Sequence, residues 1–192
     1  MLPDPFSALA RTAVRRICFG DGERIFSVDQ RSDGFFYVAS GEVHMIRHTV
    51  SGNRVIIHRA YAGDFFAEAS LFSETYHCDA GAVSATEVCK IDKKATLVMM
   101  DNSASFSRAV SASFARQIQA YRRLMELRSI QSAKDRVYAA VSDGWLQGNI
   151  MTFASQIGLS HEATYRALAA LARSNRLVKA GRGDYRITDA SR

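Results

Sequence analysis

The sequence predicts an α+β protein in which a β-rich domain is followed by one long helix and by a small module of helices that ends in a β-hairpin. From about residue 17 to residue 97, apolar and polar residues alternate with a period of two between glycine-containing turns, as in short antiparallel strands. Residues 102–128 contain no glycine or proline and place apolar residues three and four apart, as in an amphipathic helix. We therefore expect three regions, at residues 1–100, 101–131 and 132–192.

The composition is that of a folded globular protein. Of 192 residues, 47% are hydrophobic and 23% are charged, and both prolines lie within the first five positions, which excludes extended disorder. No apolar run approaches the ~20 residues of a membrane-spanning helix, and the chain does not begin with a secretory signal, so we expect a cytoplasmic protein without membrane partners. The three cysteines are far apart and form no Cys-x-x-Cys pair, which predicts reduced thiols and no zinc site.

The first region contains a predicted β-hairpin. Apolar and polar residues alternate from Glu42 to Arg47, a Ser-Gly-Asn turn occupies residues 51–53, and the alternation resumes at Val55. Further turn signals keep the strands short, as in a sandwich, barrel or jelly roll. The histidines of the hairpin are expected on its solvent-exposed face: His44, His48 and His58.

The long helix carries a stripe of large apolar residues. At 1.5 Å per residue its length is about 40 Å, which is more than a small domain needs. We interpret the stripe as the interface of a homodimer in which the helices 101–128 of two chains pair, and packing on the same chain alone is the alternative. The stripe consists of Phe106, Val110, Phe114, Ile118, Tyr121, Leu124, Met125 and Leu127.

Positive charge is concentrated in the second half of the chain. Residues 1–100 contain 11 Lys and Arg against 12 Asp and Glu, residues 101–131 contain 5 against 2, and residues 132–192 contain 9 against 5. This asymmetry is expected of a neutral domain joined to a module that binds a polyanion, although a solvated basic face gives the same counts. The candidate phosphate-binding residues are Lys134, Arg136, Arg173, Arg176, Lys179 and Arg182.

Residues 152–168 have the pattern of a helix-turn-helix. Thr152 is a predicted N-cap, Ala154 is small where two helices cross, Gly158 ends the first helix, and Ser160 caps the second. The second helix would bury Thr164, Leu168 and Leu171. Its exposed N-terminal end would then enter the major groove of double-stranded DNA with His161, Glu162, Tyr165 and Arg166.

These exposed side chains suit base contacts. The guanidinium of Arg166 can donate to O6 and N7 of guanine, and the carboxylate of Glu162 can accept from N4 of cytosine, while His161 and Tyr165 can contact phosphates or base edges. The segment 177–187 then supplies two short strands around a Gly-x-Gly turn, as in a winged helix. A helical hairpin with an ordinary solvated face is the alternative interpretation.

Two blocks of the sequence carry a family resemblance. Residues 63–72, Gly-Asp-Phe-Phe-Ala-Glu-Ala-Ser-Leu-Phe, are similar to an effector-domain signature, Gly-(Asp)-x-(Phe)-Gly-Glu-x-x-Leu-Phe. Residues 157–166 are similar to a recognition segment that carries Arg-Glu-x-x-x-Arg, with Glu162 and Arg166 matching and His161 in place of the first arginine. With these blocks, the whole chain resembles the cyclic-AMP receptor protein/FNR (Crp/Fnr) family of bacterial transcription regulators, to which a helix-turn-helix protein known as CAP belongs.

The resemblance implies an N-terminal cyclic-nucleotide-binding-like β-roll (jelly roll), a long dimerisation helix and a C-terminal winged helix-turn-helix. It also implies RNA polymerase as a partner. The dimer would place two recognition helices on half-sites of an inverted repeat about 34 Å apart, and a signal bound in the β-roll would change their spacing.

The resemblance places an effector pocket in the β-roll, but this pocket lacks a phosphate-binding group. Family members that bind cyclic nucleotides have an Arg-Ser or Arg-Ala pair ten residues after the signature glutamate, and here Cys78 and Asp79 stand in those places. Cyclic AMP is therefore not the expected effector. A regulator that binds DNA constitutively, without any effector, is a second interpretation. The candidate pocket residues are Glu68, Ala69, Ser70, Cys78, Asp79 and Tyr121.

Two other cofactor classes differ in the ligands that they require. An iron–sulfur cluster is not expected, because Cys18 is the only cysteine near the N-terminus. Residues 66–69 resemble the nitric-oxide-responsive denitrification regulators, some of which bind haem, and His77 and Cys78 are candidate iron ligands. The alternative is that both are ordinary residues of a strand and turn, as Cys89 is an ordinary buried residue.

The sequence therefore predicts a dimeric, sequence-specific DNA-binding transcription regulator whose effector is not cyclic AMP or is absent. The alternative is a sensor of haem or another small ligand whose C-terminal domain contacts protein instead of DNA. An enzyme is not expected, because the sequence shows no paired carboxylates, Ser/His/Asp order, metal-ligand cluster or phosphate-binding glycine loop.

Overall fold

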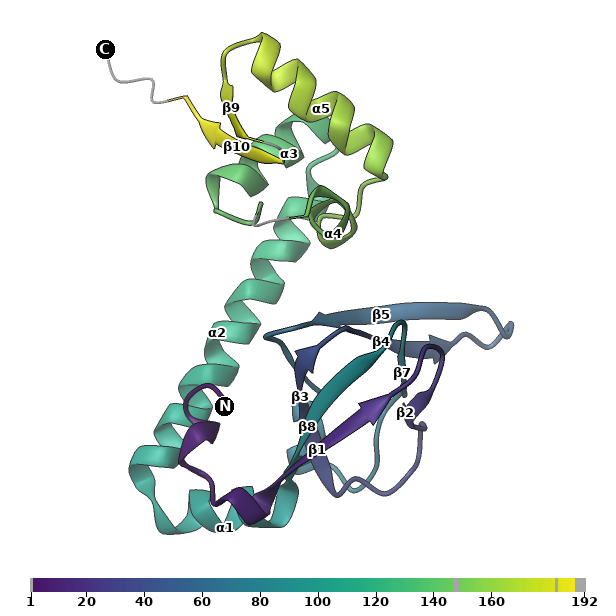
Figure 1. Cartoon of the computed structure of the whole chain (residues 1–192), viewed down its shortest axis with the longest axis vertical. Helices are drawn as coiled ribbons and strands as arrows, with labels where there is room; N and C mark the ends of the chain where they lie inside the picture. Colours follow the sequence, from purple (N-terminus) through teal and green to yellow (C-terminus); the bar gives the residue numbers. More distant parts are fainter. Residues whose placement is uncertain (1, 147–148, 182, 189–192) are drawn as a thin grey trace. The chain divides into compact units, whose positions relative to one another are not determined.

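The computed structural model describes residues 2–146, 149–181 and 183–188 (Figure 1). Arg182, one of the candidate phosphate-binding residues, lies outside this part of the chain. The chain divides into two compact units, residues 1–113 and 114–192. The division falls within the long helix, so that each unit contains a part of it.

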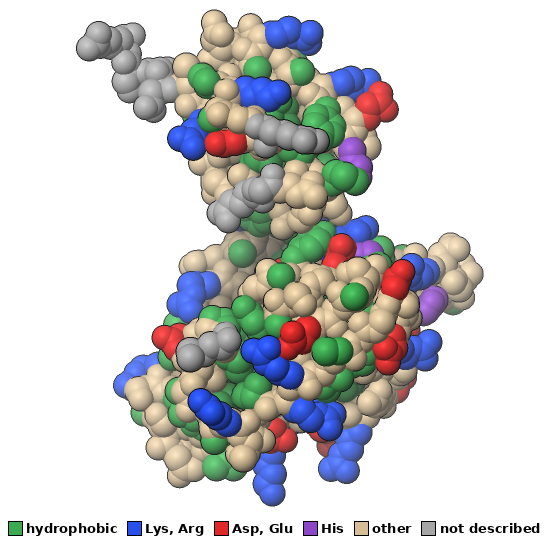
Figure 2. Space-filling view, in the orientation of Figure 1, with side chains coloured by type: hydrophobic (Ala, Val, Ile, Leu, Met, Phe, Trp, Pro, Cys, Tyr) green, Lys and Arg blue, Asp and Glu red, His purple; other side chains and the backbone are tan. Residues whose placement is uncertain are grey.

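The first unit contains two antiparallel four-stranded sheets, which confirms the predicted β-rich domain. One sheet has the strand order β1-β8-β3-β6 and the other the order β2-β7-β4-β5. The strands are β1 (Val14–Phe19), β2 (Arg24–Phe26), β3 (Gly34–Ser40), β4 (Glu42–His48), β5 (Arg54–Tyr61), β6 (Phe65–Phe66), β7 (Asp79–Ala82) and β8 (Thr86–Asp92). Lys, Arg, Asp and Glu side chains are interspersed on the face of this unit that Figure 2 shows, in keeping with its balanced charge.

Aromatic rings fill the core of this unit. Phe26 stacks on Tyr76 with 3.9 Å between ring centroids, and Phe36 stacks on Phe66 at 5.0 Å. Phe26 also stacks on Phe36 at 5.5 Å, so that the four rings form one continuous group. The hydroxyl of Tyr76 donates to the carbonyl of Gly34 at 2.8 Å, which satisfies its only donor, and burial raises the pKa of this phenol.

The predicted hairpin is present as β4 and β5, but two of its three histidines are not on a solvent-exposed face. His44 is only 7% exposed and His58 is half-buried, whereas His48 is exposed as expected. His44 lies opposite Arg59 on one side and Gly81 on the other, just before a β-bulge at Met45. Alternation of polar and apolar residues therefore gave the wrong environment for His44, because the residues across the sheet decide its burial.

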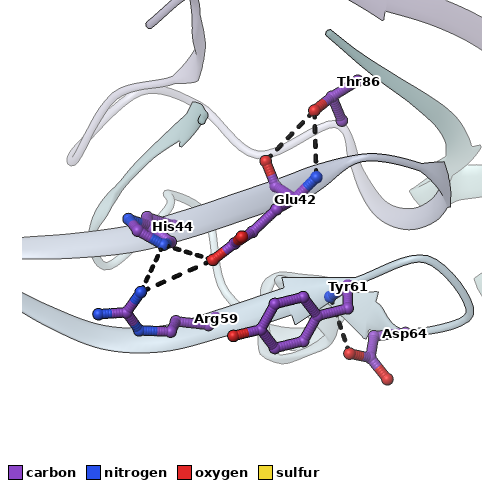
Figure 3. Close-up of polar contacts among 6 residues, drawn as sticks. All are labelled: Glu42, His44, Arg59, Tyr61, Asp64 and Thr86. Carbon is purple, nitrogen blue, oxygen red and sulfur yellow. Dashed lines mark hydrogen bonds and ion pairs between the residues drawn. The ribbon is translucent and has the colours of Figure 1, made fainter. Parts of the chain in front are cut away.

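Charged neighbours surround the buried imidazole of His44 (Figure 3). Its Nε2 lies 2.7 Å from Oε1 of Glu42 and 3.0 Å from Nη1 of Arg59, and that same guanidinium nitrogen is 3.6 Å from the Glu42 carboxylate. Its Nδ1 is buried and makes no hydrogen bond to any described residue. The backbone of Glu42 is held in turn by Thr86, whose hydroxyl donates to the Glu42 carbonyl at 3.2 Å.

Two helices follow the last strand, whereas the sequence predicts a further strand and then a single long helix. The period-two pattern predicts strands as far as residue 97, but α1 (Lys93–Asn102) begins directly after β8. Asp92 caps this helix by accepting from the Ala95 amide at 2.7 Å, and this local cap overrides the short alternation. The long helix, α2 (Ala104–Ser129), then starts after an extended residue, Ser103.

Only parts of the apolar stripe of α2 are buried. Phe106 and Val110 are buried in the first unit, and Leu127 is buried in the second. Between them, the helix exposes three large apolar side chains, Ile118, Tyr121 and Met125. Within the described residues, no helix is both long enough and apolar enough to cross a membrane.

The second unit packs three helices and a hairpin around the end of α2. Its elements are α3 (Ala133–Ser142), α4 (Ile150–Gln156), α5 (His161–Arg173), β9 (Leu177–Gly181) and β10 (Asp184–Ile187). The core includes Leu127, Val137, Phe153, Leu168 and Leu171. The predicted N-cap of α4 is wrong: Asn149 caps the helix by accepting from Met151, and Thr152 lies inside it.

Candidate functional site

The start of α5 is fixed by its own sequence. Oγ of Ser160 accepts from the Ala163 amide at 3.1 Å, and the Thr164 hydroxyl donates to the Ser160 carbonyl at 3.0 Å. Gly158 has a φ of 70°, a left-handed conformation that favours glycine and turns the chain out of α4. These contacts confirm Ser160 as the N-cap and Gly158 as the turn residue.

The two faces of α5 differ in the way that the sequence predicts. Thr164, Leu168 and Leu171 are fully buried. The other face begins with four exposed residues: His161, Glu162, Tyr165 and Arg166. The structure therefore brings the four candidate base-contacting residues together on one exposed end of one helix.

Arg166 and Glu162 are available for outside contacts. Their side chains are 75% and 82% exposed, and Nη1 of Arg166 is 3.9 Å from Oε1 of Glu162. An exposed pair at this separation stabilises the helix by only ~0.3–0.5 kcal/mol. Both charged groups can therefore turn toward a ligand with little loss of folding stability.

The candidate phosphate-binding residues fall into two groups. Lys134, Arg173 and Lys179 form no hydrogen bond or ion pair with the described residues, and Arg173 and Lys179 are exposed. Arg176 instead lies 3.8 Å from the ring centroid of Tyr138, and its Nη1 is 3.6 Å from the Asp135 carboxylate. Arg136 is engaged by backbone carbonyls and is not a free cation, contrary to its expected role.

The hairpin β9–β10 presents Lys179 beside the helices. The two strands pair antiparallel with Lys179 opposite Tyr185, and a register shift follows at Asp184. Tyr185 packs against the core of the second unit, while Lys179 is exposed. Placing a lysine on the exposed side of such a hairpin suits a contact to a phosphate backbone.

The effector-domain signature forms a tight turn in the first unit. Ala67 has a φ of 60°, the left-handed conformation, at the position where the signature has glycine, and it is followed by a 3-10 helix, Glu68–Phe72. Ser70 is buried, and its hydroxyl donates to the Gly34 carbonyl at 2.9 Å. Glu68 is half-buried and Ala69 is exposed.

Cys78 and Asp79 are used by the protein itself. Cys78 belongs to the aromatic core, and burial raises the pKa of its thiol, which Arg47 partly offsets. Oδ1 of Asp79 accepts from the Val28 amide at 3.0 Å, and Oδ2 is 3.7 Å from Nδ1 of His48. Neither residue supplies the cation that a cyclic phosphate needs, and the adjacent Arg47 donates from Nε to the His77 carbonyl.

The candidate haem ligands His77 and Cys78 differ in their burial. Cys78 is buried, whereas its neighbour His77 is exposed, so the two side chains do not face the same space. Among the described residues, no group of three or more His, Cys, Asp and Glu side chains is arranged to hold a metal ion. Tyr121 lies in the second compact unit and not in the β-rich unit with the other candidate pocket residues.

Comparison with known proteins gives a family match for the first unit and a relative that aligns with most of the chain. Residues 16–103 match the family described as the cyclic nucleotide-binding domain. The chain is 26% identical over 191 residues to the cyclic AMP receptor protein of Thermus thermophilus, a match that covers 95% of this chain and 88% of that protein. The first unit therefore contains a cyclic nucleotide-binding domain, and the chain as a whole is similar to regulators of the Crp/Fnr type. The structure combines the β-roll of a cyclic nucleotide-binding domain with the helices described above.

Two further similarities connect this chain with FixK proteins. It is 28% identical over 131 residues to the nitrogen fixation regulation protein FixK of Bradyrhizobium diazoefficiens, covering 68% of this chain and 54% of that protein. The solved structure of FixK2 from Bradyrhizobium japonicum superposes with a TM-score of 0.65 at 19% identity, covering 92% of this chain and 93% of that one. At this identity the superposition concerns the fold alone.

The sequence located the exposed end of α5 but missed the residues that hold it. No sequence motif points to Arg128, near the end of α2, yet its guanidinium donates to the carbonyl of Gln156, the last residue of α4. The sequence carries no local signal for this contact, because the two partners are 28 residues apart.

Proposed function

We propose that this chain is a cytoplasmic, dimeric, sequence-specific DNA-binding regulator of the Crp/Fnr type in which α5 is the recognition helix of a winged helix-turn-helix. The exposed N-terminal end of α5 carries the proposal. The side chains of Arg166 and Glu162 can form hydrogen bonds with base edges. His161 and Tyr165, which are exposed on the same end of the helix, make neighbouring contacts. Lys179 on the hairpin and Arg173 at the end of α5 contact phosphates and set the salt dependence.

The exposed stripe on α2 supports the dimer. Ile118, Tyr121 and Met125 follow one another at spacings of three and four, and Met125 is 73% exposed. A symmetric pair of α2 helices would remove this apolar surface from water and present two copies of α5 to two half-sites. The operator is accordingly an inverted repeat with half-sites about one helical turn apart, at which the regulator also meets RNA polymerase.

The proposal includes an effector other than cyclic AMP, or none. Cys78 and Asp79 occupy the place of a phosphate-binding pair, and both are already engaged within the first unit. A carboxylate at this position repels a cyclic phosphate. DNA binding is therefore expected without added nucleotide.

Selection of binding sites from a random duplex pool, at one fixed salt concentration, tests the proposed function. The purified chain without added ligand should enrich an inverted repeat. Retention of DNA without any enriched sequence, lost when salt is raised, would contradict it and would favour a sensor whose C-terminal unit contacts protein.

Titration with cyclic AMP in a calorimeter tests the effector part separately. We expect no saturable binding and no change in affinity for the selected operator. Saturable binding, or an affinity that increases with cyclic AMP, would overturn this part of the proposal and leave DNA binding itself intact.

A further inference from the structure

The carbonyl end of α4 is held by two arginines from other helices. A helix leaves its last carbonyls without partners inside the helix, and these carry the negative end of its dipole. Here Nε and Nη2 of Arg128, on the last turn of α2, donate to the Gln156 carbonyl at 3.3 Å and 3.0 Å. Gln156 is the last residue of α4, so this bond ties the end of one helix to the end of another.

Arg136 makes a second and more extensive connection. Its Nε and Nη2 donate to the carbonyl of Ile130, between α2 and α3, at 2.9 Å and 2.6 Å. Its Nη1 donates to the carbonyls of Ile157 and Gly158, in the turn before α5, at 3.2 Å and 3.3 Å. One half-buried guanidinium therefore joins the link that follows α2 to the turn that precedes α5.

The geometry of the second connection needs arginine at position 136. A guanidinium presents five N–H donors in one rigid plane, whereas an ammonium has a single nitrogen and cannot contact carbonyls on two separate segments in the same way. Glycine is favoured opposite because residue 158 has a φ of 70°, and the side chain of Arg128 packs against it: a Cβ there would lie 3.4 Å from Nε of Arg128. The turn at Gly158 and the two arginines therefore form one packed group, which we name the arginine clamp.

We propose that the arginine clamp, Arg128 and Arg136, positions the recognition helix by fixing the turn before α5 to the end of the dimerisation helix α2. In the proposed function, neither of these two arginines contacts DNA. The clamp makes α5 follow α2, so that the dimer presents its two recognition helices at one separation and one rotation. This inference rests on the proposed function, because it concerns how α5 is presented to the half-sites.

A rigid presentation predicts strict half-site spacing. Inserting one base pair between half-sites moves one of them by ~3.4 Å and rotates it by ~34° about the DNA axis, given 10–10.5 base pairs per turn. A dimer with a fixed α2–α5 arrangement cannot follow this rotation without strain. A dimer with a loosened clamp can follow it while the base contacts of each α5 stay the same.

The experiment compares the unsubstituted protein with Arg136→Lys and Arg128→Lys on three duplexes. These carry the selected operator, the operator with one base pair inserted between the half-sites, and one half-site alone. Arg122→Lys is the matched control, because Arg122 is an exposed arginine of α2 without a hydrogen bond or ion pair to the described residues. Thermal unfolding of every variant shows whether the fold is kept.

We expect the unsubstituted protein and Arg122→Lys to prefer the selected spacing by about tenfold or more, of the order of one mismatched base pair. Arg136→Lys should reduce this preference to about threefold or less, with affinity for the single half-site changed by less than about twofold. Arg128→Lys should act in the same direction and less strongly, because it contacts one carbonyl and not three.

The possible failures are distinguishable. If the unsubstituted protein selects no inverted repeat, the proposed function fails and the inference fails with it. If it does select one, and Arg136→Lys keeps the full spacing preference, the inference alone is overturned. Equal losses on all three duplexes would also overturn it, since that result indicates a general role in stability.

Discussion

Replacement of Arg166 by alanine should separate base recognition from folding. The side chain is 75% exposed, and its ion pair with Glu162 is long, at 3.9 Å. Its loss should therefore lower the free energy of unfolding by at most about 0.5 kcal/mol. Loss of a bidentate contact to a guanine edge should instead reduce the discrimination between operator and other DNA by ~1–3 kcal/mol, which is about 5-fold to 150-fold.

Fluorescence anisotropy at fixed salt can measure this difference. Each protein is titrated into a labelled operator and into a shuffled duplex of the same length. Arg166→Ala should lose affinity for the operator and keep its affinity for the shuffled duplex within about threefold, the electrostatic share of one phosphate contact. Lys179→Ala is the control, because an exposed lysine on the hairpin should weaken both complexes alike. Equal losses of Arg166→Ala on both duplexes would show that Arg166 contacts phosphate and that our assignment is wrong.

Three further predictions concern the core, the dimer and pH. Leu168→Ala should lower the free energy of unfolding in urea by about 3 kcal/mol, because Leu168 is fully buried; Ala169→Ser, on the exposed side of α5, should change it little. Met125→Glu should halve the mass in sedimentation, whereas Gln119→Glu on the same helix should leave a dimer; a monomer without any substitution would contradict the α2 interface. Burial lowers the pKa of His58 below its usual 6.5, with a partial offset from Asp64. As pH drops through 6.5, the imidazole is therefore protonated in the unfolded chain before it is protonated in the folded protein, and the free energy of unfolding should fall. His58→Gln should remove that fall and His48→Gln should not; identical pH profiles for the three proteins would refute the cause.

The sequence determined the local features of the fold. Ser160, Gly158 and the buried residues of α5 were all predicted correctly, because a cap, a left-handed turn and a helix face depend on residues within about four positions of one another. The hairpin of β4 and β5 was predicted for the same reason, since its two strands are neighbours along the chain. The motif blocks at residues 63–72 and 157–166 likewise indicated the Crp/Fnr family, because each block is one contiguous run of the chain.

The tertiary structure decided which environment each polar residue occupies. The alternating pattern placed His44 in solvent, whereas its neighbours across the sheet bury it against Glu42 and Arg59. Similarly, positive charge alone assigned Arg136 to phosphate, whereas the fold brings the carbonyls of Ile157 and Gly158, more than 20 residues away, within reach of its guanidinium. Long polar side chains find partners that are 20 or more residues away, and only the packing of helices and strands determines which partners those are.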